Sequence, residues 1–477
     1  MKICMVAEGC YPYVVGGVSG WINNLITSFP EHEFIMLAVV SDRSVRGKFK
    51  YTLPDNLTEV YEVYLNDAEW ISHAKKNYKK ARLSAKNQAA LNSLLIGKDT
   101  DWETLTMLLQ NQKLSLDALL MGPDFLDAAV KSYEIKNGEI VFSDFLWTMR
   151  SMYLPLFLAM HSYIPKADIY HCVATGYSGV LGAMAKIIYP DSRLLVSEHG
   201  IYTREREEEV IKAQWIAGIY KDIWIEQFKK MSLFAYHQAD KVTSLYERAR
   251  QLQIELGCAE DKTVVTPNGI DPLKFADVPM KQEDDEYINI GAILRVTPIK
   301  DVKTMIMAFG YAKNNNPKLK LWIMGPVDED EEYAKECFEL VRDMQIKDVI
   351  FTGRINTSEY IGKMDFTILT SISEGQPLTI LESFAVRKPV IATDVGNCRG
   401  LIYGETDTYG KAGVLTHIMN VEEIKDAILL LADNEQKRIE YGNNGYKRLI
   451  RKYTLVDMKN TYEGIYMQLS EKMKSRR

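Results

Sequence analysis

The sequence predicts an α/β protein with two doubly wound lobes, each built on a parallel sheet. Short apolar runs rich in Val and Ile alternate with longer segments of helical periodicity, which is the pattern of βαβ units. The alternation breaks at a polar acidic stretch, residues 281–286, and then resumes, which indicates a second lobe. Between residues 70 and 158 the strand rhythm stops and the pattern is largely helical, which indicates an insertion in the first lobe.

The predicted strands are the apolar runs bounded by polar or turn-forming residues. In the first lobe they cover residues 2–8, 34–41, 60–65, 168–173, 194–198, 241–245 and 263–266. In the second lobe they cover residues 287–294, 318–324, 349–352, 366–370, 389–393 and 412–415. A linker is predicted at residues 272–286, so the first lobe is expected over residues 1–275 and the second over residues 276–455. Residues 456–477 are predicted to form a helix with a packed stripe of Tyr and Met side chains.

The composition is that of a globular protein with little charge bias. The 58 Lys and Arg side chains against 64 Asp and Glu give a net charge of −6, which argues against a nucleic-acid partner. The six cysteines are scattered without a CxxC pair, so neither a zinc site nor a disulfide framework is indicated, and a cytoplasmic protein with reduced thiols is expected. No apolar stretch is long enough for a secretory signal or a spanning helix, so any membrane association is expected to be peripheral, through partner proteins.

Candidate site residues follow the strands, because open α/β sheets bind ligands at the carboxyl ends of their strands. After the first strand, Gly16 and Gly17 open a helix whose N-terminus favours phosphate, although a tight turn explains the pair equally well. After the fifth strand, His199 precedes Gly200, where a neutral imidazole can hydrogen-bond a sugar hydroxyl or a developing charge. The alternative is that His199 has only a structural role.

Cationic residues follow strands in both lobes. In the second lobe Arg295 ends a strand and Lys300 lies where the next helix begins, which suits a diphosphate, although two solvated surface cations would look the same. In the first lobe Arg204 and Arg206 follow His199, and ion pairs with the neighbouring glutamates explain them better than a ligand does.

The most informative segment is residues 373–382, which follows a predicted strand of the second lobe. Pro377 is predicted as the first helical residue and Gly375 as the turn, which leaves the N–H groups of Leu378 and Thr379 available to an anion. Two carboxylates lie eight residues apart in this segment, which separates them by roughly 12 Å. That separation is too large for a pair acting on one bond, but it suits the two ends of a nucleoside diphosphate sugar, one carboxylate holding the sugar and the other the ribose.

These features together resemble the retaining, metal-independent glycosyltransferases of family 4. The resemblance rests on Gly16-Gly17, His199-Gly200, Arg295 with Lys300, and Glu374 with Glu382 in E-x7-E spacing. Longer strings narrow the resemblance to the glycosyltransferases of Pel exopolysaccharide systems: Glu8-Gly9-x-Tyr11-Pro12-Tyr13, Tyr170-His171 to Thr175-Gly176-Tyr177, residues 198–206 and residues 371–378. The resemblance spans nearly the whole chain. It implies the GT-B fold, in which two Rossmann-like lobes face across a cleft: residues 1–275 form the acceptor-side lobe and residues 276–455 the nucleotide-sugar-binding lobe. A C-terminal helix, residues 456–477, is expected to cross back to the first lobe.

The resemblance also implies roles for single residues. The expected catalytic residues are His199, Arg295, Lys300 and Glu374. Of these, the two cations would bind the donor diphosphate, Glu374 the hydroxyls of the donor sugar, and His199 the sugar 6-hydroxyl. The expected donor-binding residues are Gly16, Gly17, Arg354, Ile355, Gly375, Gln376, Pro377, Leu378, Thr379 and Glu382. The ribose would lie on Glu382 and the base near Arg354 and Ile355.

For substrates and partners, the resemblance implies UDP-glucose or a related UDP-sugar as donor, a polysaccharide as acceptor, and membrane-embedded Pel export proteins as partners. No metal or other cofactor is expected, and the leaving phosphate itself accepts the proton of the acceptor, so no protein nucleophile is assigned. The insertion at residues 70–158 is interpreted as a feature of the Pel-type subclass at which an acceptor or partner docks. Residues 386–388 depart from the family, which often has a glycine there.

Three alternatives remain at the level of sequence. Asp328-Glu329-Asp330 has the DxD form that binds Mn²⁺ or Mg²⁺ in other glycosyltransferases, but Asp99-Thr100-Asp101 repeats this form, and acidic residues before a helix are favoured by its dipole. A UDP-sugar epimerase of the same fold would need carboxylates or histidines near C2 and C3 of the sugar, and we locate none. A non-catalytic nucleotide-sugar-binding scaffold would lack Arg295, Lys300 or Glu374, and all three are present.

Overall fold

The structure is a computed structural model that describes residues 1–66, 82–97, 99–135, 140–214, 216 and 218–474. The chain forms two compact units, one of residues 1–265 with 463–477 and one of residues 266–462. This division differs from the expected lobe limits because the segment after Val265 packs with the second unit. Asn268 bonds Gln376 there, and the N–H of Ile270 donates to the carbonyl of Tyr453 at 3.0 Å.

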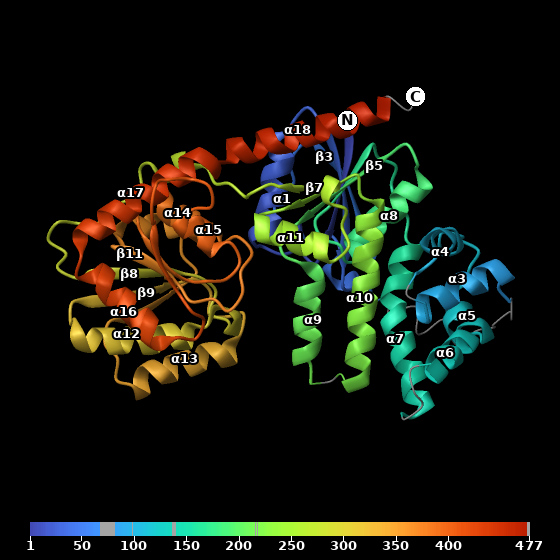
Figure 1. The fold of residues 1–477 in the computed structure, drawn as a ribbon, viewed down its shortest axis with the longest axis horizontal. Helices are drawn as coiled ribbons and strands as arrows, with labels where there is room; N and C mark the ends of the chain where they lie inside the picture. Colours follow the sequence, from blue (N-terminus) through green and yellow to red (C-terminus); the bar gives the residue numbers. More distant parts are fainter. Residues whose placement is uncertain (67–81, 98, 136–139, 215, 217, 475–477) are drawn as a thin grey trace. The chain divides into compact units, whose positions relative to one another are not determined.

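The first unit contains, in its described residues, a seven-stranded sheet in which neighbouring strands are parallel (Figure 1). The strands are β1 (Lys2–Glu8), β2 (Glu33–Val40), β3 (Leu57–Tyr64), β4 (Ile169–Cys172), β5 (Arg193–Glu198), β6 (Lys241–Ser244) and β7 (Thr263–Val265). Their order is β3-β2-β1-β4-β5-β6-β7, so the order reverses between β1 and β4, where doubly wound sheets bind ligands. Every residue of β4 and β5 is buried, as expected for a parallel sheet covered on both faces.

The second unit contains, over the part of it that is described, a six-stranded parallel sheet of order β10-β9-β8-β11-β12-β13. Its strands are β8 (Ile288–Ile293), β9 (Leu319–Met324), β10 (Val349–Gly353), β11 (Phe366–Leu369), β12 (Val390–Thr393) and β13 (Gly413–Thr416). Each observed strand overlaps a predicted one. The predicted α/β fold with two doubly wound parallel sheets is therefore confirmed.

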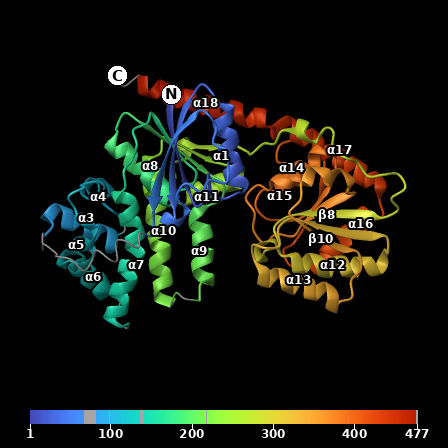
Figure 2. The same ribbon diagram turned by 180° about the vertical axis from the view of Figure 1, so that it is seen from behind.

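Helices line both faces of each sheet, as Figures 1 and 2 show from opposite sides. In the first unit these helices are α1 (Gly17–Ser28), α8 (Tyr177–Ile188), α10 (Gly218–Gln238) and α11 (Glu247–Glu255), while α9 (Tyr202–Lys212) packs on α10. In the second unit they are α12 (Val302–Asn315), α13 (Glu331–Asp343), α14 (Leu378–Ala385), α15 (Cys398–Tyr403), α16 (Val421–Ala432) and α17 (Glu435–Lys452).

The predicted insertion is helical in its described part. Its helices are α3 (Ala85–Leu95), α4 (Trp102–Leu109), α5 (Leu116–Met121), α6 (Pro123–Ile135) and α7 (Phe142–His161). Residues 67–81, 98 and 136–139 lie outside the described residues. The described helices share one apolar core with the sheet, because Leu91, Phe125 and Phe145 belong to the same buried cluster as Val63 and Val196. The insertion is thus part of the first unit and not a separate domain.

The last helix, α18 (Leu455–Lys474), begins in the second unit and ends in the first. In the first unit the hydroxyl of buried Tyr466 is hydrogen-bonded to Nδ1 of His171 at 2.7 Å. Nε2 of the same ring is hydrogen-bonded to Ser197 Oγ at 2.7 Å, and Thr243 donates to that oxygen at 2.8 Å. Burial lowers the pKa of His171 to about 3, so the ring is neutral and one nitrogen donates while the other accepts. A buried polar chain therefore ties the end of α18 to β4, β5 and β6.

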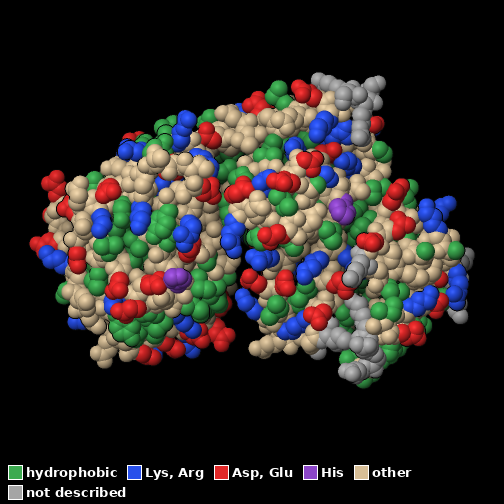
Figure 3. Space-filling model, in the orientation of Figure 1, with side chains coloured by type: hydrophobic (Ala, Val, Ile, Leu, Met, Phe, Trp, Pro, Cys, Tyr) green, Lys and Arg blue, Asp and Glu red, His purple; other side chains and the backbone are tan. Residues whose placement is uncertain are grey.

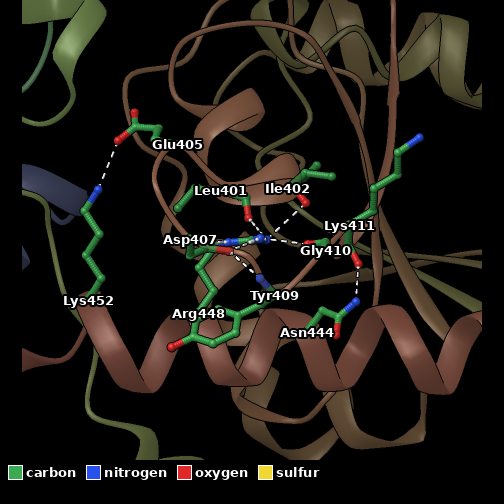
Figure 4. A network of polar contacts seen from close by, with 10 residues as sticks. All are labelled: Leu401, Ile402, Glu405, Asp407, Tyr409, Gly410, Lys411, Asn444, Arg448 and Lys452. Carbon is green, nitrogen blue, oxygen red and sulfur yellow. Dashed lines mark hydrogen bonds and ion pairs between the residues drawn. The ribbon is translucent and has the colours of Figure 1, made fainter.

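In the second unit a buried arginine forms hydrogen bonds that hold the segment between α15 and β13 in place (Figure 4). Arg448 of α17 is 1% exposed and forms a two-armed ion pair with Asp407, through Nε to Oδ2 at 2.7 Å and Nη2 to Oδ1 at 2.8 Å. The same guanidinium donates to the carbonyls of Leu401, Ile402 and Gly410 at 2.9, 3.1 and 2.7 Å. These bonds use all of its N–H donors. Hydrogen bonding to Arg448 in turn holds the pKa of Asp407 below its usual range.

The visible surface carries mixed charge. On the face shown in Figure 3, acidic and basic side chains are interspersed over each unit. Within the described residues, no helix combines the length and the apolar character needed to cross a membrane.

Candidate functional site

The second unit places four predicted site residues at the carboxyl edge of its sheet. Arg295 follows β8, Lys300 ends the 3-10 helix η4 (Pro298–Lys300), Arg354 follows β10, and Glu374 lies between β11 and α14. Because neighbouring strands are parallel, their carboxyl ends share one edge, where ligands of this architecture bind.

Lys300 and Glu374 form a largely buried ion pair at this edge. The Lys300 ammonium contacts Oε1 of Glu374, and the Ser371 hydroxyl donates to the same oxygen at 2.6 Å. The side chains of the lysine and the glutamate are 17% and 12% exposed, so solvent screens their attraction only weakly. No described residue donates to Oε2 of Glu374. That oxygen is therefore able to accept from a ligand hydroxyl.

The backbone around Lys300 is fixed by the neighbouring strand end. Thr370 Oγ1 donates to the carbonyls of Lys300 and Asp301 at 3.0 and 3.1 Å. Asp301 adopts φ 46°, in the left-handed region that Asp tolerates better than most residues, and its carboxylate accepts from the N–H of Thr304 at 3.4 Å to cap α12. Sequence reasoning missed both Thr370 and Asp301, although an Asp before an apolar helical run is a helix-start signal.

Arg295 and Arg354 contact the acidic triplet that follows β9. Arg295 Nη1 lies 2.9 Å from Oε2 of Glu329, and Arg354 Nη2 lies 3.3 Å from Oδ1 of Asp328. The two arginine side chains are 56% and 62% exposed, so a ligand can reach them. Asp330 accepts from a backbone N–H in the first turn of α13 at 3.0 Å. Each acid of the triplet thus has a cation or a helix end as partner, and among the described residues no cluster of three or more His, Cys, Asp or Glu is placed to hold a metal ion.

The loop before α14 differs from the prediction in detail. The helix begins at Leu378, one residue later than predicted, because Pro377 has ψ 115°. No described side chain caps this end, so the first N–H groups, including those of Leu378 and Thr379, are available to an anion. The side chain of Gln376 is buried and engaged with the main chain of Asn268, accepting from its N–H at 3.0 Å and donating to its carbonyl at 2.9 Å. Gln376 therefore clamps the loop, and its amide is not available to a ligand in this arrangement.

Gly396 is a residue of this edge that the sequence did not reveal. Its φ is 53°, and a Cβ on it would lie 2.1 Å from the carbonyl oxygen of Glu374 and 2.5 Å from that of Gly375. The N–H of Asn397 donates to the carbonyl of Gly375 at 2.8 Å. The turn after β12 thus supports the Glu374 loop at a distance that only glycine permits.

Glu382 lies in the second turn of α14. Its side chain is half-buried, burial raises its pKa, and no described residue bonds to its carboxyl group. Removing a carboxyl group from water without a partner costs free energy. A ligand that supplies hydroxyl donors would recover that cost, which makes Glu382 a binding candidate.

In the first unit, His199 follows β5 and packs against α1. Its ring meets Trp21 nearly edge to face, with centroids 4.4 Å apart. Nε2 of His199 is buried and has no hydrogen-bond partner among the described residues. Helix α1 begins at Gly17, and a Cβ on Gly16 or Gly17 would have no atom within 4 Å, so open space lies beside this turn.

We expect the His199 imidazole to stay neutral down to about pH 4, because burial lowers its pKa to about 4. The unfolded chain binds this proton near the ordinary histidine pKa of about 6.5. Protonation therefore favours unfolding as the pH falls between these two values, and the stability contributed by the neutral ring is lost there. NMR titration of the ring resonance, assigned with a His199→Gln variant, measures the midpoint, and a midpoint near 6.5 would contradict the expectation.

Family models match both parts of the chain. The model described as "Domain of unknown function (DUF3492)" matches residues 1–261, more than half of the chain, and the model described as "Glycosyl transferases group 1" matches residues 275–448. Among solved structures, HepE of Anabaena in complex with UDP covers 98% of this chain and 100% of its own, with a TM-score of 0.64 and 14% identity. Sucrose-phosphate synthase from Thermosynechococcus elongatus covers 98% of this chain and 99% of its own, with a TM-score of 0.61 and 15% identity. These likenesses show the fold, which is GT-B.

Curated relatives match shorter segments. The alpha-monoglucosyldiacylglycerol synthase of Streptococcus pneumoniae is 31% identical over 231 residues, 43% of this chain and 51% of that protein. The poly(ribitol-phosphate) alpha-N-acetylglucosaminyltransferase of Staphylococcus aureus is 24% identical over 233 residues, 48% of this chain and 44% of that protein. The chain thus spans about half the length of these relatives.

The second unit therefore carries a domain of the glycosyl transferases group 1, which includes Arg295, Lys300 and Glu374, and the chain has the GT-B fold. The chain belongs to the family whose domain is described as a domain of unknown function (DUF3492).

Proposed function

We propose that the chain transfers a hexose from a UDP-sugar, most simply UDP-glucose, to a growing exopolysaccharide of Pel type. The transfer retains the configuration at the anomeric carbon and requires no metal ion, as in a PelF-like enzyme. The observation that carries the proposal is the buried Lys300 and Glu374 pair, whose Oε2 accepts from no described residue, next to the uncapped start of α14.

Relatives support a UDP-sugar as donor. HepE of Anabaena has been solved with UDP and with UDP-glucose. An Escherichia coli relative, 23% identical over 319 residues, is a UDP-Gal:alpha-D-GlcNAc-diphosphoundecaprenol alpha-1,3-galactosyltransferase. The Pel-type acceptor, the membrane-embedded export partners and a cytoplasmic location rest on the sequence strings that resemble Pel-system enzymes.

In this proposal the second unit binds the donor. Lys300, Arg295 and the N–H groups at the start of α14 stabilise the charge that builds on the departing diphosphate. Arg295 exchanges the carboxylate of Glu329 for a phosphate oxygen, since both anions compete for one exposed guanidinium.

The carboxylates of Glu374 and Glu382, together with the loop that follows β10, orient the sugar, the ribose and the base of the donor. Glu374 holds hydroxyls of the sugar through Oε2, and Glu382 holds the ribose. Arg354 and Ile355, after β10, line the base. In the first unit, His199 offers a neutral imidazole to a sugar hydroxyl. The leaving phosphate takes the proton of the acceptor hydroxyl, so the protein supplies no nucleophile.

Calorimetry of the full chain with UDP in the presence of EDTA tests the donor site. We expect UDP to bind without metal and Glu382→Gln to weaken binding at least about tenfold, or about 1.4 kcal/mol, because the ribose hydroxyls lose a charged acceptor. Glu440→Gln, on the exposed surface of α17, is the matched control and should bind UDP as the wild type does. Binding that requires Mn²⁺, or no binding of UDP, would contradict the proposal.

A further inference from the structure

We propose that Glu8 and Arg206 of the first unit hold the acceptor sugar, and that this acceptor carries no negative charge. The inference rests on the proposed function, because it assigns the second substrate of the same reaction. It concerns the first unit by itself, and the residues that carry it lie on adjacent strand ends and on the helices that follow them.

Glu8 is the last residue of β1, beside the point where the strand order reverses. Its Oε2 accepts from the N–H of Tyr177, the first residue of α8, at 3.0 Å, and its Oε1 accepts from the hydroxyl of Tyr202 at 3.4 Å. Burial raises the pKa of Glu8, and the nearby charge of Arg206 opposes that rise. Each carboxylate oxygen can accept more than one hydrogen bond, so Glu8 retains capacity for a ligand hydroxyl.

Arg206 lies one helical turn beyond Tyr202 on α9. Its guanidinium carbon lies 5.3 Å from the centre of the Tyr202 ring, and its Nη1 lies 2.8 Å from Oε2 of Glu209. Its Nε is buried and donates to no described residue. The side chain is 35% exposed, so the group is reachable from solvent. The stack on Tyr202 and the electrostatic contact with Glu8 hold the guanidinium close to the carboxylate.

Unsatisfied polar atoms concentrate in this segment. Nε2 of His199, Oγ1 of Thr203 and Nε of Arg206 are all buried without a hydrogen-bond partner among the described residues. Glu198, the residue before His199, is by contrast hydrogen-bonded. Its carboxylate accepts from the side chains of Tyr236 and Gln253 at 2.6 and 2.9 Å.

Buried polar atoms normally find partners, so this cluster indicates a ligand rich in hydroxyl groups. Open space lies beside the residue that follows Glu8. Gly9, next to Glu8, has φ 63°, and a Cβ on it would have no atom within 4 Å.

The charged side chains of α9 indicate which kind of acceptor sugar can bind. Four glutamates lie within residues 205–209, against Arg204 and Arg206, and Glu8 adds a further carboxyl group at the strand end. An acceptor bearing phosphate or carboxylate would meet like charge here. A neutral or amino sugar would not, so the acceptor is expected to lack negative charge.

The test measures transfer from UDP-glucose to 4-nitrophenyl hexosides by the full chain, together with UDP affinity by calorimetry. We expect Glu8→Gln and Arg206→Gln each to raise the KM for the hexoside at least tenfold and to leave the Kd for UDP unchanged. Arg204→Gln and Glu207→Gln each remove one charge, positive and negative respectively, from side chains of α9 that have no contact among the described residues, and they should leave both quantities unchanged. Tyr202→Phe keeps the ring under Arg206 and removes the hydroxyl bond to Glu8, so a smaller rise in KM is expected.

Several outcomes would contradict the proposed acceptor subsite at Glu8 and Arg206. They are an unchanged hexoside KM in both variants, an equal loss of UDP affinity, and better transfer to glucose 6-phosphate than to a neutral hexoside. A wild type that binds UDP but neither transfers to nor binds any hexoside, as seen by saturation-transfer NMR, also overturns it and leaves the donor proposal intact. Failure of the wild type to bind UDP contradicts the proposed function itself. Arg206→Gln keeps the test decisive if Glu8→Gln fails to fold, since Glu8 also caps α8.

Discussion

Replacing Lys300 with Ala is expected to lower kcat by about 100- to 1,000-fold, the usual effect of removing one preorganised donor from a developing oxyanion. The side chain is largely buried and its ammonium is held by Glu374, so it needs no reorganisation when charge builds on the departing diphosphate. Its loss also leaves the Glu374 carboxylate without its cation, which loosens the group that orients the sugar. Steady-state kinetics with UDP-glucose measures the change.

Lys303 provides the control for this change. It lies on the next turn, is 37% exposed on its side chain, and contacts Glu336, away from the Glu374 loop. Lys303→Ala should keep kcat within about twofold of the wild type, because exposed ion pairs contribute little. A kcat for Lys300→Ala close to that of Lys303→Ala would remove Lys300 from the catalytic machinery.

Replacing Arg448 with Met is expected to lower the free energy of unfolding of the second unit by about 3–5 kcal/mol, the cost of breaking a buried ion pair on one side. The variant leaves the partly buried carboxylate of Asp407 without its cation and three carbonyls without their donor. Urea denaturation followed by a probe in the second unit measures the loss. Arg451→Met, on the exposed side of the same helix, is the matched control and should cost less than about 0.5 kcal/mol.

The same network gives a pH signature. Because Arg448 holds the pKa of Asp407 below its usual range, the pair stabilises the fold above the ordinary Asp pKa, and this contribution is lost as the pH falls through the lowered value. The difference between wild type and Arg448→Met should therefore shrink in acid. A difference that is small at neutral pH and constant with pH would show that the network contributes little.

The fold was predictable because strands of a buried parallel sheet are continuous apolar runs, and each such run became a strand. The reversal of strand order at β1 and β4 needed no separate signal, since doubly wound sheets place it there. The placement of Glu374 and Lys300 at the strand ends followed from the same reasoning. Their mutual contact did not, because it joins side chains far apart in the sequence.

The roles of several loop residues depended on contacts that no local pattern records. Gln376 looks like a ligand group in sequence, but its amide is engaged by Asn268, more than a hundred residues earlier in the chain. Gly396 lies in an ordinary turn, and its requirement for glycine comes from the Glu374 carbonyl of another loop. The sequence favours ion pairs between Arg206 and adjacent glutamates. The structure gives it Glu209 as partner and leaves its Nε unsatisfied.

The path of α18 determines the order in which the two units are completed during synthesis. The first unit draws on residues 1–265 and on residues 463–474, so its last piece leaves the ribosome after every residue of the second unit. Until then, His171 lacks the Tyr466 hydroxyl that one of its ring nitrogens bonds in the finished protein. Domains generally fold as units while the chain is being made. The first unit is therefore the later of the two to be completed, because part of its last helix follows the second unit in the sequence.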